Sequence, residues 1–150
     1  PLFCSMGGMS AVDTCKRLKA DYGFDLNVEQ LLADGHEFLE EHLAKDVTAR
    51  HEVVAVVHHV RGLGHKTAVA SAGRRDHVHT TLKRIDITHL FDAVITAEDA
   101  ARSKPHPDLF LAAADRLGLK PADCVVIEDS PRGKEAADAA GMPCILVEPA

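Results

Sequence analysis

The segment Val126-Ile127-Glu128-Asp129, followed by Ser130-Pro131-Arg132-Gly133, constrains the fold more than any other part of this chain. A short apolar run that ends in two acids predicts a buried strand that carries carboxylates to one end of a sheet. Ser130 is suited to be a helix N-cap, and Pro131 to be the first helical residue. Because open α/β sheets bind ligands at the carboxyl ends of their strands, we expect both acids to lie at a binding edge.

The rest of the chain from His65 onward alternates in the same way between apolar runs and helical patterns. The expected strands cover residues 67–71, 93–96, 124–127 and 144–147, and the expected helices cover about residues 73–84, 107–118 and 131–140. Strands that alternate with helices through short loops predict a parallel, doubly wound α/β sheet between two layers of helices.

The N-terminal part of the chain has helical periodicity throughout. Helices are expected from Ser10 to Tyr22, from Asn27 onward, and from about Arg50 to Leu63. The last of these is rich in β-branched residues and would also fit a strand, but its length and the Gly62/Gly64 stop favour a helix. We therefore expect a helical layer or cap over residues 1–63 and an α/β core over residues 64–150.

Composition narrows the functional classes. A formal charge of −6 argues against a nucleic-acid partner and leaves no basic patch for a membrane surface. No apolar stretch approaches the ~20 residues of a membrane span, and no signal peptide is visible. The four cysteines show no Cys-x-x-Cys spacing. Reduced structural thiols in a cytoplasmic protein are therefore expected, without nucleic-acid or membrane partners.

Three groups of residues follow the expected strands and suit one chemistry. Ser71 stands where a strand turns into a helix, and backbone N–H groups at such a turn can bind an anion. Lys104 lies in the proline-stiffened segment Ser103-Lys104-Pro105-His106-Pro107-Asp108. Glu128 and Asp129 suit a divalent, oxygen-preferring cation such as Mg²⁺. A hydroxyl, an ammonium and two carboxylates at one sheet edge match the needs of a phosphate ester with Mg²⁺.

Each of these residues also has an ordinary structural explanation when it is taken singly. Ser71 could be a helix N-cap, Lys104 a solvated loop lysine, and Glu128-Asp129 a pair that caps the next helix. Only their joint occurrence in this order favours the functional interpretation. The ten histidines do not suggest a metal site, because they lack partners at ligand spacing.

In order and spacing, these motifs resemble the haloacid dehalogenase superfamily of phosphohydrolases, and most closely its β-phosphoglucomutase-like and sugar-phosphatase branch. Ser71 is similar to the serine of the family's second motif, and Lys104 in Lys-Pro-His-Pro-Asp to the lysine of the third. Glu128-Asp129-Ser130, with Gly133 and the helix Ala-Ala-x-Ala-Ala-Gly-Met, is similar to the fourth motif. The resemblance covers roughly residues 7–147.

The resemblance implies a Rossmann-like core and a two-step phosphoryl transfer through an aspartyl phosphate, with Mg²⁺ as cofactor. Ser71 and Lys104 would be catalytic, with Ser71 bonding a phosphate oxygen and Lys104 offsetting negative charge. Asp129 would bind Mg²⁺ directly, and Glu128 would lie close by or act through water. The implied phosphate-binding residues are Ser71, Ala72, Gly73, Arg74 and Lys104.

One departure from the family pattern is large. The family's nucleophile and acid/base lie in an Asp-x-Asp-Gly-Thr motif after the first strand, and this sequence contains no Asp-x-Asp. Pro1 falls inside what would be the cap. The family's first strand, which lies between the strands that precede Ser71 and Asp129, is therefore expected upstream of these residues. We expect a fragment with two unpaired strand edges that has little turnover alone.

The favoured function is Mg²⁺-dependent hydrolysis of a small phosphorylated metabolite of the sugar-phosphate type in the full-length protein. A phosphosugar mutase is an alternative, although Ala11 stands where mutase-type relatives carry an arginine for a second phosphate. An alternative of another class is a non-catalytic phosphate-binding or regulatory domain. The sequence determines neither the substrate nor the oligomeric state.

Overall fold

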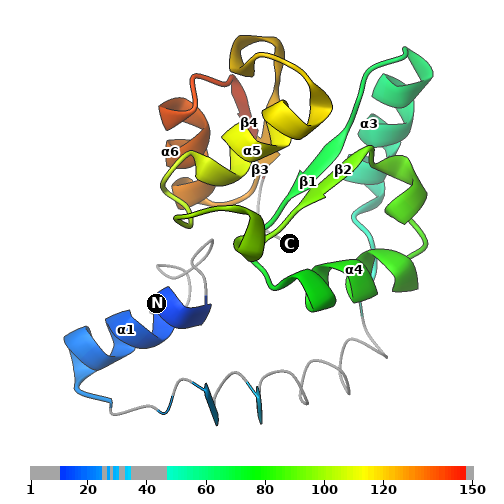
Figure 1. Ribbon diagram of the computed structural model, residues 1–150. Helices are drawn as coiled ribbons and strands as arrows, with labels where there is room; N and C mark the ends of the chain where they lie inside the picture. Colours follow the sequence, from blue (N-terminus) through cyan, green and yellow to red (C-terminus); the bar gives the residue numbers. More distant parts are fainter. Residues whose placement is uncertain (1–10, 25–26, 28, 31–32, 35–46, 148–150) are drawn as a thin grey trace.

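A computed structural model describes residues 11–24, 27, 29–30, 33–34 and 47–147 of the chain (Figure 1). The helices α1 (Ala11–Tyr22) and α3 (His51–Gly62) precede the first strand. The core then alternates β1 (Ala68–Ala70), α4 (Arg75–Arg84), β2 (Ala93–Ile95), α5 (Asp108–Leu117), β3 (Val126–Glu128), α6 (Pro131–Ala139) and β4 (Cys144–Leu146). Three short 3-10 turns complete it: η2 (Thr88–Leu90), η3 (Ala97–Asp99) and η4 (Pro121–Asp123).

This order confirms the predicted alternation, and the ambiguous valine-rich segment is the helix α3. Most of the helix expected from Asn27 lies outside the described residues, but the Asn27 side chain accepts a hydrogen bond from the Gln30 backbone at 3.1 Å, as an N-cap does. α1 and α3 have 12 residues each. A membrane span needs ~20 apolar residues, and none of the helices described reaches that length and apolarity.

The four strands form two separate parallel pairs. In the first pair Ala68 lies opposite Ala93 and Ala70 opposite Ile95, and in the second Val126 lies opposite Cys144. Within the described residues no pairing joins β1 to β3, so each keeps one open edge. The interruption lies at the position where the family resemblance places the family's first strand. The predicted class, a parallel α/β fold, is observed, and within the described residues the two expected unpaired strand edges are those of β1 and β3.

The helix α5 holds the two halves together (Figure 1). Phe110 and Ala114 of α5 pack in a buried cluster with Val126 of β3 and with alanines of α6. Leu109 and Ala113, one residue earlier in each case, pack with Ile95 of β2. Residues four apart share a helix face, so α5 presents two adjacent faces to two different strand pairs.

The other side of the second strand pair is apolar and exposed in the described residues. Side chains alternate along a strand, so Val126 and Glu128 are buried whereas Val125 is 62% and Ile127 38% exposed. On β4, Ile145, which lies opposite Ile127 in the register, is 56% exposed. The helical layer is therefore present on the α5–α6 side of β3 and β4, and the described residues do not cover the opposite side.

Candidate active site

At the end of β1 the backbone turns sharply around the Ser71 hydroxyl. The Ser71 N–H donates to the Ile95 carbonyl at 2.9 Å, and the Ser71 Oγ accepts from the Gly73 N–H at 3.1 Å. A Cβ at Gly73 would lie 3.2 Å from both this hydroxyl and the Val78 side chain, which favours glycine there. Because the Ser71 Oγ accepts this bond, its own hydrogen remains to be donated to a ligand.

The ordinary explanation of Ser71 as a helix cap is wrong, since Arg74 is the N-cap residue of α4. At this helix start the backbone N–H of Arg75 already has an acceptor. Its N–H donates to the Glu98 carboxylate at 3.1 and 3.2 Å. The guanidinium of Arg74 is paired with Asp76 at 2.9 Å on the exposed surface. The carboxylates of Glu98 and Asp76 therefore already bind the Arg75 N–H and the Arg74 guanidinium at this helix start.

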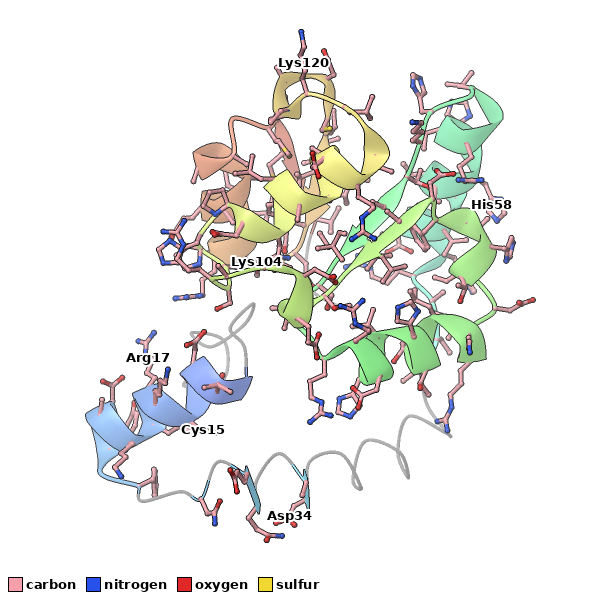
Figure 2. The ribbon with its side chains drawn as sticks, in the orientation of Figure 1. Cys15, Arg17, Asp34, His58, Lys104 and Lys120 are labelled. Carbon is pink, nitrogen blue, oxygen red and sulfur yellow. The ribbon has the colours of Figure 1, made fainter. Side chains whose placement is uncertain are left out.

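Lys104 is buried and not solvated, with 6% of the residue exposed (Figure 2). Its Nζ pairs with the Glu128 Oε1 and lies 3.3 Å from the carbonyl oxygen of Ala70, the last residue of β1. The ammonium also lies 4.8 Å from the centroid of the Phe110 ring. One lysine thus links the carboxyl ends of β1 and β3, which are not paired with each other.

Glu128 is held by hydrogen bonds to both of its carboxylate oxygens. Beside the Lys104 contact, its Oε2 accepts from the Asp129 N–H at 2.8 Å and from the Ser130 N–H and Oγ at 2.9 and 3.0 Å. Burial by itself would raise the pKa of this carboxyl, but the hydrogen bond and charge of Lys104 outweigh it, and the pKa is lowered. Glu128 is therefore an anion at neutral pH.

The first turn of α6 closes around this pair. Ser130 is the N-cap, as predicted, and its Oγ accepts from the Gly133 N–H at 3.0 Å. A Cβ at Gly133 would lie 2.0 Å from the Glu128 Cδ, so only glycine allows this approach. Arg132 donates twice, at 2.6 and 3.2 Å, to the carbonyl oxygen of Lys104. Sequence reasoning missed Arg132, whose only signal was its place in this turn.

Of the predicted site residues, Lys104 and Glu128 are in direct contact, whereas no contact joins Ala72, Arg74 or Asp129 to Lys104 within the described residues. Lys104 contacts Glu128 directly and contacts Ala70, the residue just before Ser71. Asp129 follows Glu128 and is exposed. Ala72 packs in the cluster around Ile95, and Arg74 faces Asp76. The edge predicted from the sequence therefore exists around Lys104, while the roles of these residues in phosphate binding remain predictions.

The acidic residues fit a magnesium ion in part. Asp129 is exposed, and no hydrogen bond within the described residues occupies its carboxylate, so it can supply an oxygen ligand. Both oxygens of Glu128 already accept hydrogen bonds, and its Oε1 is paired with Lys104. Elsewhere among the described residues, no three His, Cys, Asp or Glu side chains gather as a metal cluster. A magnesium ion at Asp129 would need further oxygen ligands from water, from a phosphate or from other residues.

The structure is thus a parallel α/β fold with a buried lysine–carboxylate pair, Lys104 and Glu128, at the ends of its strands. The haloacid dehalogenase-like hydrolase family matches residues 5–147, so this chain belongs to that family. YhcW of Bacillus subtilis (strain 168), a protein named as a phosphatase, is 36% identical over 130 residues, 87% of this chain and 59% of YhcW. The fructose-1-phosphate phosphatase YqaB of Escherichia coli (strain K12) is 41% identical over 86 residues, 57% of this chain and 42% of YqaB.

Solved structures confirm the fold. CbbY from Rhodobacter sphaeroides, in complex with phosphate, superposes with a TM-score of 0.84 at 21% identity, over 95% of this chain and 66% of CbbY. The β-phosphoglucomutase of Clostridium difficile superposes with a TM-score of 0.83 at 23% identity, over 99% of this chain and 69% of that protein. The resemblance inferred from the motifs is thereby confirmed at the level of family and fold. The chain spans 59% and 42% of the lengths of YhcW and YqaB.

Proposed function

We propose that this chain is the greater part of a Mg²⁺-dependent phosphomonoester hydrolase that acts on a small, sugar-type phosphate. The observation that carries the proposal is Lys104, which is buried where β1 and β3 end. Relatives named as phosphatases of fructose 1-phosphate, of hexitols and of validoxylamine A 7'-phosphate support a polyhydroxylated substrate.

The charges at this edge explain why a divalent cation is part of the proposal. Lys104 is balanced by Glu128, and the exposed Asp129 adds a further negative charge. A phosphate dianion that approached this set alone would be repelled. Bound at Asp129, Mg²⁺ would supply positive charge to the phosphate oxygens. Glu128 would then serve mainly to hold Lys104 charged and in place, while the Ser71 hydroxyl donates to a phosphate oxygen.

The nucleophile of the proposed reaction lies outside this chain. A strand of the longer protein would pair in parallel with the open edges of β1 and β3, and an aspartate at its carboxyl end would lie near Lys104, which links the ends of these two strands. In the first step its carboxylate oxygen would attack phosphorus, and the sugar oxygen would leave with a proton from a neighbouring acid. In the second step water would hydrolyse the acyl phosphate and release phosphate. Lys104 would offset negative charge in both steps.

The test uses the longer protein that carries the Asp-x-Asp strand. We expect phosphate release from sugar phosphates that depends on Mg²⁺, and a fall of about 100-fold in kcat/KM for Asp129→Asn. Asp115→Asn, which removes an exposed carboxylate from α5, is the matched control and should leave kcat/KM unchanged. Absence of hydrolysis across a panel of sugar phosphates would contradict the proposal, as would turnover by residues 1–150 at the rate of the longer protein.

A non-catalytic phosphate-binding domain is the second candidate. One observation favours it: the carboxylate that contacts Lys104 among the described residues, that of Glu128, is already held by hydrogen bonds to both of its oxygens. Binding of inorganic phosphate without turnover in the longer protein would select this function. A phosphosugar mutase would instead convert a hexose 1-phosphate to the 6-phosphate, which the same assay distinguishes from phosphate release.

A further inference from the structure

Arg132 stands at a position where the stability of its own helix does not favour a cation. It follows the N-cap Ser130 and Pro131, so it lies in the first turn of α6. The helix dipole favours acidic side chains there and disfavours basic ones, yet this turn carries no acid. Arg132 is half-buried, and no carboxylate pairs with it within the described residues. Stabilisation of α6 therefore does not explain this arginine.

The guanidinium of Arg132 reaches instead to the loop before α5. Its Nη2 and Nε donate to the carbonyl oxygen of Lys104 at 2.6 and 3.2 Å, across 28 residues of sequence. A carbonyl oxygen has two lone pairs, so this one acceptor can take both donors of the planar guanidinium. These two bonds fix the backbone of Lys104 against the first turn of α6.

The same turn also holds the other end of Lys104. Glu128, at the end of β3, pairs with the Lys104 Nζ. Lys104 is thus bound at its backbone by Arg132 and at its ammonium by Glu128, and both partners belong to one β3–α6 connection. Asp129, the proposed magnesium ligand, lies between these two partners in the sequence. The turn therefore sets where Lys104 stands relative to Asp129.

The flexible stem of Lys104 makes the position of its backbone important. The ammonium lies 3.3 Å from the Ala70 carbonyl oxygen and 4.8 Å from the centroid of the Phe110 ring. It reaches these groups from a loop, outside the helices and strands described. A shift of the loop would move the ammonium away from both groups, and a misplacement of about 1 Å at a reacting centre can cost about 100-fold in rate.

We propose that Arg132 is a positioning residue for Lys104. By holding the Lys104 carbonyl against α6, it keeps the ammonium at the carboxyl ends of β1 and β3, where the phosphate would bind. The proposal rests on the proposed function, because that function gives the ammonium a phosphate to act on. Arg132 acts through Lys104 and does not itself touch the reacting atoms.

Direct binding of a ligand is the alternative role for Arg132. Together with Lys16 of α1, it lines a cavity of about 760 Å³ whose lining residues do not include Lys104. Within the described residues both hydrogen bonds of the guanidinium go to the Lys104 carbonyl, which favours positioning. The two roles predict different kinetic changes, since loss of a ligand-binding residue raises KM whereas loss of a positioning residue lowers kcat.

The first test does not require turnover. In the longer protein, brief acylation with an N-hydroxysuccinimide ester, followed by peptide mass spectrometry, measures how often the Lys104 ammonium leaves its buried contacts. Lys104 is 6% exposed, so we expect slow labelling of the wild type. Arg132→Gln and Arg132→Lys should both raise the labelling rate about 10-fold, because an ammonium does not supply the two-donor fork of a guanidinium. Unchanged labelling of Lys104 would overturn the proposal.

Lys134→Gln is the matched control for this test. It removes a positive charge from the same end of α6, where Lys134 pairs with Asp138 at 2.6 Å, and it should leave the labelling of Lys104 unchanged. Amide exchange over α5 should stay unchanged in every variant, because buried apolar contacts hold α5 to both strand pairs. Faster labelling together with faster exchange throughout α5 would indicate loss of the fold and would overturn the positioning role.

The second test measures phosphate release by the longer protein from a panel of sugar phosphates that includes fructose 1-phosphate. For the substrate hydrolysed fastest, Arg132→Gln should lower kcat about 30-fold and change KM less than about threefold. In a Lys104→Ala background Arg132→Gln should have no further effect, because it acts through Lys104.

Three kinetic results would overturn the proposal: a higher KM at unchanged kcat, full activity of Arg132→Lys, or an equal effect of Arg132→Gln in the Lys104→Ala background. Absence of phosphate release from the whole panel by the wild type would contradict the proposed hydrolase function alone. The labelling of Lys104 would then still decide whether Arg132 positions it.

Discussion

At the end of β3 every oxygen of the Glu128 carboxylate accepts a hydrogen bond, whereas at the end of β1 the Ser71 hydroxyl accepts one and keeps its hydrogen to donate. Both strand ends contact the Lys104 ammonium, β1 through the Ala70 carbonyl and β3 through the Glu128 carboxylate. Within the described residues, the Ser71 hydroxyl at the end of β1 donates no hydrogen bond. The end of β3 acts as a fixed anchor for Lys104. The end of β1 retains the capacity to bind a ligand.

The packing around the two strand ends also differs: the end of β3 is buried more closely than the end of β1. Glu128 lies under the closely packed first turn of α6, with Gly133 against its side chain. The turn after Ser71 leads instead into a helix start whose arginines form ion pairs nearer the surface, Arg74 with Asp76 and Arg75 with Asp99. Buried pairs respond strongly to the loss of one partner and exposed pairs respond weakly. Substitutions at the two ends should therefore differ in size.

The largest expected effect is that of Glu128→Gln, which leaves Lys104 buried without a counter-charge. We expect the free energy of unfolding to fall by about 3–5 kcal/mol, measured by urea denaturation followed by circular dichroism. Glu135→Gln removes an exposed carboxylate from the same helix–strand unit, and its change should stay within about 0.5 kcal/mol. Similar values for the two variants would show that the Lys104–Glu128 pair does not anchor this half.

Gly133→Ala should come next. The new methyl group would require the Glu128 side chain to move, because the Cβ position lies 2.0 Å from its Cδ. Overpacking of this kind costs about 1–3 kcal/mol. Gly62→Ala, at the end of α3 with no atom within 4 Å of the added carbon, is the control and should be neutral or slightly stabilising. A tolerated Gly133→Ala would mean that Glu128 is not held where the structure places it.

The smallest expected effect belongs to the β1–β2 half and depends on pH. The hydrogen bond from Arg75, with those from Thr96, lowers the pKa of Asp99 from 3.8 to about 2. A carboxyl whose folded pKa is depressed contributes stability above its unfolded pKa, and this contribution is lost as the pH falls from 3.8 toward 2. The difference in unfolding free energy between the wild type and Asp99→Asn should therefore shrink over that range.

Acid denaturation curves of the two proteins, recorded in parallel, check this prediction. Asp86→Asn, for which the described residues show no ion pair, serves as the control that removes a carboxylate without breaking such a pair. An Asp99→Asn curve that runs parallel to the wild type at all pH values would exclude Asp99 from the stabilising network.

Much of the architecture could be predicted from local pattern. The cap at Ser130, the proline after it and the alternation of apolar runs with helical periodicity all describe short-range geometry, and the structure confirms them in α6 and in the order of the elements. The motifs around Ser71, Lys104 and Glu128 led to the correct family for a related reason. Each motif places a particular residue type directly after a strand, and such a motif can be recognised from a few consecutive residues of the sequence.

Contacts between distant segments could not be predicted in this way. Nothing local distinguishes Glu128, which is buried against Lys104, from Asp129, which is exposed, because the difference arises from the alternation of a strand against α6. The approach of Lys16 and Arg132 to one cavity depends on how α1 lies against the core. The sequence by itself determined the elements and the chemistry at their ends. Only the tertiary structure decided which charges are buried together and which remain free, because burial and pairing depend on packing between segments far apart in the chain.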